Sequence, residues 1–177
     1  MYPKVIYIVR HGEKPGETHI EHIDDGVNLA PAGRTRATGI AHHAPSLFSV
    51  KSHKKINYVF ATAKSKMSVR PIETIQPLAE FCKTKINAKF RDEDFYKLAK
   101  EITGKKKYDQ SVVVICWHHG KIPHLIEALG GIAGVHPIEN GHWDDRVFDR
   151  VIRMTKTENG ILVESLPQRL LYGDSIL

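Results

Sequence analysis

Apolar residues in this chain gather in short runs, and segments of helical periodicity separate these runs. The run Val-Ile-Tyr-Ile-Val at 5–9 and the run at 111–117, which contains Val-Val-Val-Ile, are typical of strands that a sheet buries on both faces. Two weaker extended segments, at 56–61 and at 86–90, contain β-branched or aromatic residues. The two strongest runs are therefore predicted to be central strands.

Between these runs, apolar positions recur at the three- and four-residue spacing of helices. Segments with this spacing, or with residues that favour a helix start, lie at 29–43, 72–83, 92–102 and 122–129. Near the end, 147–154 and 161–165 predict an antiparallel hairpin that turns through 158–160. Strands that alternate with helices predict an α/β fold, here a three-layer α/β/α sandwich with a mostly parallel central sheet and an antiparallel edge hairpin.

Length and cysteine content narrow the class of protein. The 177 residues suffice for one core, and we expect residues 1–177 to form a single domain. The two cysteines, Cys82 and Cys116, fall in a predicted helix and a predicted strand, which favours a reducing compartment, the cytoplasm. No apolar stretch approaches the roughly 18 residues that span a bilayer, so no membrane association is expected. The oligomeric state leaves no signal.

The formal net charge is +6, with lysines concentrated at 51–55, 64–66, 83–85 and 105–107. These clusters fall mostly in predicted turns, so solvated surface charge is the simplest interpretation, and steering of anionic substrates is the alternative. No helix-turn-helix, zinc-finger or aromatic RNA-binding pattern accompanies the lysines. Nucleic acid is therefore not an expected partner.

Chemistry-bearing residues follow both strong strands directly. Arg10-His11-Gly12 comes after the first, and His118-His119-Gly120 after the other. Arginine presents a planar fork of donors that matches phosphate oxygens, a neutral imidazole can attack phosphorus, and Gly12 lets a bulky anion approach the backbone. Ligands of parallel sheets bind beyond the carboxyl ends of strands. The sequence therefore predicts that both histidine segments meet at one anion site.

Three segments, in this order, resemble motifs of the histidine phosphatase (phosphoglycerate mutase-like) superfamily: Arg10-His11-Gly12, Arg70-Pro71-Ile72-Glu73-Thr74 and Trp117-His118-His119-Gly120. The resemblance implies a small member of that fold without cofactor or metal. It implies that His11 is the nucleophile that forms a phosphohistidine intermediate. His119 is then the second essential histidine, and Arg10, Gly12, Arg70 and His119 bind the phosphate.

This sequence departs from the superfamily pattern at two positions. Ile75 stands where a small residue is usual, and His118 stands where similar small proteins carry glutamate. Because side chains alternate along a strand, only one of His118 and His119 is expected to point into the pocket, and the resemblance assigns that role to His119. His118 stays a candidate pocket residue. The general acid is left open among Glu13, Asp24, Asp25, Asp92, Glu93 and Asp94.

The favoured function is hydrolysis of a phosphate ester or phosphoramidate, on a phosphorylated small molecule or a phosphoprotein. One alternative is a catalytically degenerate module that binds phosphate without turnover. Another is a metal-dependent hydrolase, which is disfavoured because the pairs His42-His43, His118-His119 and His19-His22 lack strong ligand spacing. The segments 12–28 and 131–146 give no prediction about the substrate.

Overall fold

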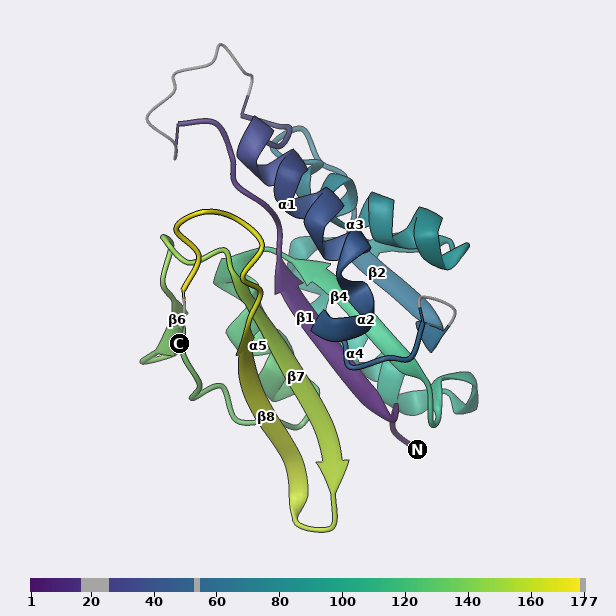
Figure 1. Ribbon diagram of the computed structural model, residues 1–177. Coiled ribbons are helices and arrows are strands. Elements are labelled where there is room, and N and C mark those ends of the chain that lie inside the picture. Colours follow the sequence, from purple (N-terminus) through teal and green to yellow (C-terminus); the bar gives the residue numbers. More distant parts are fainter. Residues whose placement is uncertain (17–25, 53–54, 176–177) are drawn as a thin grey trace.

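The computed structural model describes residues 1–16, 26–52 and 55–175, and its centre is a six-stranded sheet with the order β3-β2-β4-β1-β7-β8 (Figure 1). The strands are β1 (Val5–Arg10), β2 (Tyr58–Thr62), β3 (Ile86–Phe90), β4 (Val112–Trp117), β7 (Arg150–Thr157) and β8 (Gly160–Pro167). The first four run parallel, and β7 and β8 form an antiparallel hairpin at one edge. The predicted mostly parallel sheet with an edge hairpin is confirmed.

Strands β1 and β4 lie side by side in the middle of the sheet. Every residue of both strands is buried, as their unbroken apolar runs predict. Their register pairs Val5 with Val112 at one end and Arg10 with Trp117 at the other. The two strands therefore end together, and the residues that follow them start from adjacent positions.

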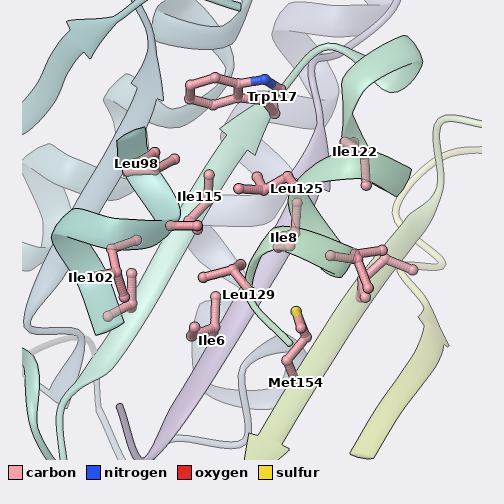
Figure 2. Close-up of a cluster of buried hydrophobic side chains, with 14 of the residues drawn as sticks. Ile6, Ile8, Leu98, Ile102, Ile115, Trp117, Ile122, Leu125, Leu129 and Met154 are labelled. Atoms are coloured by element: carbon pink, nitrogen blue, oxygen red, sulfur yellow. The ribbon is translucent and has the colours of Figure 1, made fainter. Parts of the chain in front are cut away.

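Helices cover both faces of the sheet. In Figure 1, α1 (Pro31–His42), α2 (Ala44–Leu47) and α3 (Arg70–Cys82) lie in front of the sheet, and α4 (Phe95–Gly104) and α5 (Ile122–Ala128) lie behind it. The pleat of each strand divides its side chains between the two layers. Ile6, Ile8 and Ile115 pack against α4 and α5 (Figure 2), whereas Tyr7, Val9 and Val114 belong to the core under α1 and α3. The expected three-layer sandwich is confirmed.

Several boundaries differ from the sequence pattern. The acidic start of the expected helix at 92–102 is a separate 3₁₀ turn, η2 (Asp92–Asp94), before α4 begins. Further 3₁₀ turns are η3 (Lys106–Tyr108) and η4 (His119–Lys121), and the segment at 131–146 contains a two-stranded sheet of β5 (Ile138–Glu139) and β6 (His142–Trp143). α3 continues through Pro77.

Two further properties bear on the class of protein. Cys82 and Cys116 are both free and buried. Within the described ranges, no helix combines the length and the apolar character that crossing a lipid bilayer requires.

Candidate active site

The candidate site lies at the carboxyl ends of β1 and β4. Arg10 is the last residue of β1, and the backbone N–H of His11 still bonds the carbonyl of Trp117 at 3.2 Å. The chain of β4 continues from Trp117 into His118 and His119. The ring centroids of these two histidines lie 5.0 and 6.5 Å from that of His11. The structure thus brings together the two histidine segments, as the rule for parallel sheets predicts.

The His11 imidazole is almost fully buried, with 2% of the residue exposed. Its Nδ1 lies 2.7 Å from the Gly12 carbonyl, which can only accept a hydrogen bond, so Nδ1 carries the proton and Nε2 keeps its lone pair. Burial holds the pKa of His11 well below its ordinary value; the Gly12 bond opposes this, and the positive charges of Arg10 and Arg70 lower the pKa further. His11 is therefore a neutral, oriented base at pH 7.

Gly12 makes contacts on both sides of its backbone. Its N–H donates to Thr74 Oγ1 at 2.8 Å, and its carbonyl holds His11. A Cβ at Gly12 would lie 2.9 Å from the backbone of Gly33 in α1. Gly12 therefore positions His11, and its binding of phosphate stays a prediction.

Arg10 is completely buried and held on one side by backbone carbonyls. Its Nη1 donates to the carbonyl of Asp145 at 2.5 Å and to that of Val147 at 3.1 Å. The Phe148 ring covers the guanidinium, with 3.6 Å from Cζ to the ring centroid. These contacts keep a permanent positive charge next to His11. Asp145 lies in the segment 131–146, which gives no prediction, and Val147 and Phe148 lie at the start of the expected hairpin; backbone carbonyls carry no residue signature in either case.

Arg70 opens α3 on the other side of His11. Its Nη1 donates to the carbonyl of Gly26, and its positive charge acts on both His11 and His118. Its own carbonyl accepts the Thr74 hydroxyl at 2.8 Å. Because Thr74 also accepts from Gly12, one side chain connects the start of α3 to the loop that carries His11. Arg10 and Arg70 therefore both border the nucleophile candidate.

The rings of both His118 and His119 lie near that of His11, and the expectation that only one of them points into the pocket stays a prediction. The alternation stops at Trp117, where β4 ends, and His119 already begins the turn η4. Burial lowers the pKa of His118 to about 4, and the nearby charges of Arg70 and His119 contribute. His118 is therefore a neutral imidazole at the position where similar small proteins carry glutamate.

The acid candidates differ in what holds them. Glu13 is bound by Arg36 of α1, with 2.7 Å between Arg36 Nη2 and Glu13 Oε1, so its carboxylate has a structural contact. The Glu93 carboxylate is exposed and pairs with Lys121 at 3.0 Å. Asp94 pairs with Lys97 at 2.6 Å on the surface. Asp24 and Asp25 lie outside the described residues.

Asp92 has the surroundings of a proton donor. It follows β3, and its backbone carbonyl accepts the indole N–H of Trp117 at 3.3 Å, which ties it to the residue before His118. Its Oδ1 is buried and has no hydrogen-bond partner in the part of the chain that the structure describes. Burial raises the pKa of Asp92 to about 6, and the charge of Glu93 adds to the rise. Such a group exchanges protons near neutral pH.

A buried network behind the site was not predicted from the sequence. Arg36, with 2% exposed, bonds Glu13, Asp174 and Gln168 at 2.7 to 3.2 Å. These contacts join α1 to the segment after β8 and to the loop after His11. Arg36 therefore supports the loop without facing the site, and an arginine in a helix gives no sequence signal for that role.

The potential metal ligands of the chain are scattered in the part that the structure describes. Among the residues that the structure describes, no group of three or more histidine, cysteine, aspartate or glutamate side chains is placed to hold an ion. The polar groups at the site are two arginines and the imidazoles of His118 and His119 around the buried imidazole of His11. Such a set is suited to a ligand with several anionic oxygens.

Comparisons with known proteins agree with this geometry at the level of the fold. The sequence matches no family model and no curated protein. Among solved structures it is similar to a candidate phosphohistidine phosphatase, SixA, from Agrobacterium tumefaciens, with a TM-score of 0.57, 17% identity, and coverage of 93% of this chain and 98% of that chain.

It is also similar to a phosphoserine phosphatase from Entamoeba histolytica that was solved in complex with 3-phosphoglyceric acid. The TM-score is 0.57 and the identity 13%, with 94% of this chain and 99% of that chain covered. At such identities the likeness establishes the fold. The chain therefore has the fold that its resemblance to the histidine phosphatase superfamily implies.

Proposed function

We propose that this protein is a phosphatase in which His11 takes up a phosphoryl group as phosphohistidine before water releases it. The observation that carries the proposal is the 2.7 Å contact between His11 Nδ1 and the Gly12 carbonyl. It leaves the lone pair on Nε2 of a buried imidazole whose pKa lies well below its ordinary value. A neutral imidazole that is fixed beside two arginines meets the requirements for attack on phosphorus.

In the first step, His11 Nε2 forms a bond to phosphorus while the bond from phosphorus to the leaving group breaks. Arg10, Arg70 and His119 hold the charge of the phosphoryl oxygens. In the second step, a water oxygen bonds to phosphorus, the P–N bond breaks, and inorganic phosphate leaves. His11 then has its lone pair back.

Asp92 is our proposed proton carrier for both steps. It gives a proton to the leaving atom in the first step and takes one from the attacking water in the second. Its pKa of about 6 supports this assignment, because a group that titrates near neutral pH can do both. Glu13 is bound to Arg36 and Glu93 pairs with Lys121, which favours Asp92 over these two carboxylates.

The proposed substrate is a phosphate ester or phosphoramidate on a small molecule or a protein, and the reaction is proposed to need no metal. The similar folds of a candidate phosphohistidine phosphatase and a phosphoserine phosphatase support this class of substrate. We also propose that residues 1–177 act as one domain. The free, buried Cys82 and Cys116 support a cytoplasmic location.

The test is a rapid quench with a radiolabelled phosphomonoester in the presence of a chelator. We expect label that is acid-labile and alkali-stable on His11, and a loss of turnover by about three orders of magnitude or more in His11→Ala. His43→Ala, at an exposed histidine after α1, is the control and should retain full turnover. Full turnover in His11→Ala would contradict the mechanism. Phosphate binding by the wild type without turnover would indicate a binding module instead.

A further inference from the structure

The segment at 145–148 contacts two of the proposed phosphate-binding residues at once. The backbone carbonyl of Asp145 accepts from Arg10 Nη1 at 2.5 Å, and the carbonyl of Val147 accepts from the same nitrogen. The carboxylate of Asp145 lies 2.9 Å from His119 Nε2. One residue therefore touches a cation at the end of β1 through its backbone and an imidazole after β4 through its side chain.

The backbone of this segment is fixed from behind. Trp143, with 3% exposed, donates its indole N–H to the carbonyl of Val147 at 2.8 Å. Asp144 donates its N–H to the Pro137 carbonyl at 3.0 Å, and Val147 donates to Asp144 at the same distance. The Asp145 side chain itself is 79% exposed, so its contact with His119 depends on where this backbone holds it.

The Asp145 carboxylate brings a negative charge next to the His119 ring. The groups near the His119 ring include the imidazoles of His11 and His118 and the carboxylate of Asp145. Burial keeps both neighbouring imidazoles neutral at pH 7. The carboxylate accepts the Nε2 proton and thereby fixes the orientation of the His119 ring at the site.

We propose that Asp145 is a positioning residue of the phosphatase reaction, which holds His119 with its carboxylate and Arg10 with its carbonyl so that both meet one phosphoryl group. This proposal rests on the proposed function. It assigns a role to a surface carboxylate in a segment without a sequence motif. Asp145 acts through His119 and Arg10 and makes no bond to the substrate.

The test uses two substitutions that leave the backbone carbonyl in place. Asp145→Ala removes the acceptor, and Asp145→Asn keeps an acceptor without charge. We expect kcat/KM for a phosphomonoester to fall about fivefold in Asp145→Ala and less in Asp145→Asn, because the pair is exposed. Thermal unfolding should stay unchanged.

Asp144→Ala is the matched control. Asp144 is the neighbouring acid in the same segment, and it pairs with Arg146 at 2.8 Å and not with His119. It should keep the wild-type kcat/KM for the phosphomonoester. An equal loss in Asp144→Ala would overturn the proposal, since general loosening of the segment would then explain the effect.

Calorimetry with inorganic phosphate separates this proposal from the proposed function. Weaker phosphate binding by Asp145→Ala than by the wild type supports the positioning role, even if the wild type turns over no substrate. Equal or tighter binding overturns it, because the carboxylate would then be indifferent to the anion or compete with it for His119.

Discussion

Gly33 allows the loop that carries His11 to lie directly on α1, and Gly33→Ala tests the importance of this contact. A Cβ at Gly33 would lie 2.5 Å from the carbonyl oxygen of Glu13 and 2.9 Å from its nitrogen. Ordinary contact begins at 3.4 Å, so the Glu13 carbonyl oxygen would have to move by about 0.9 Å and the Glu13 nitrogen by about 0.5 Å. This nitrogen belongs to the peptide bond that contains the Gly12 carbonyl, so the variant shifts that bond as well.

The peptide cannot move without loss of other contacts. The Glu13 carbonyl accepts the N–H of Ala30 at 2.9 Å, and the Glu13 carboxylate is bound by Arg36. Overpacking of this kind costs about 1–3 kcal/mol, and we expect the upper end because backbone lies on both sides. The Gly12 carbonyl orients His11. Because a misplacement of about 1 Å at a reacting group lowers the rate by about two orders of magnitude, a shift of about 0.5 Å should lower it by about one.

Urea unfolding followed by the fluorescence of the buried Trp117 and Trp143 measures the first effect, and kcat for a phosphomonoester measures the second. The control is Gly104→Ala at the end of α4, where an added Cβ meets no atom within 4 Å. It should leave activity unchanged and stability equal or slightly higher. Equal unfolding free energies for the two variants would refute the reasoning.

Two further predictions concern pH. With alkyl phosphates, wild-type kcat should fall about tenfold per pH unit above about pH 6, because the proposed donor Asp92, with a pKa of about 6, must be protonated. Asp92→Asn should abolish this pH dependence. It should slow the hydrolysis of aryl phosphates much less than that of alkyl phosphates, because an aryl leaving group departs easily without a proton. An unchanged pH profile would place the proton donor elsewhere. The pKa of His118 is lowered from 6.5 to about 4, so the unfolded chain binds its proton first, and stability falls as pH drops from about 6.5 to about 4. This group lowers the free energy of unfolding by up to ~3 kcal/mol over that range. Acid unfolding followed by circular dichroism should show a smaller loss of stability in His118→Gln than in the wild type. The same loss in both proteins would contradict this prediction.

The strands and layers could be predicted from the sequence because their signal is local. The β-branched run of β4 and the apolar run of β1 are buried along their whole length, and the antiparallel hairpin is formed by β7 and β8. The meeting of His11 with His118 and His119 also followed, because parallel strands end at the same edge of a sheet. These inferences needed only periodicity and one rule of topology.

The remaining parts of the site depend on contacts between distant segments. Arg10 is held by carbonyls of Asp145 and Val147, and a carbonyl has no signature in the amino-acid sequence. The role of Gly12 depends on the closeness of Gly33, which sequence spacing does not reveal. Strand β4 ends at Trp117, and the turn η4 begins at His119. The alternation of strand side chains, on which the prediction for His118 and His119 relied, therefore does not extend to them.

The clamp on Arg10 has a consequence for the order in which the protein is made. Arg10 belongs to the first strand to leave the ribosome, yet the carbonyls that hold it come 135 and 137 positions later. Asp174, which binds Arg36, follows that arginine by 138 positions. At roughly 5–20 residues per second, synthesis of these partners takes on the order of ten seconds. During this time the nascent chain already carries His11 but lacks the groups that fix its surroundings, so a competent site forms only after most of the chain has been synthesised.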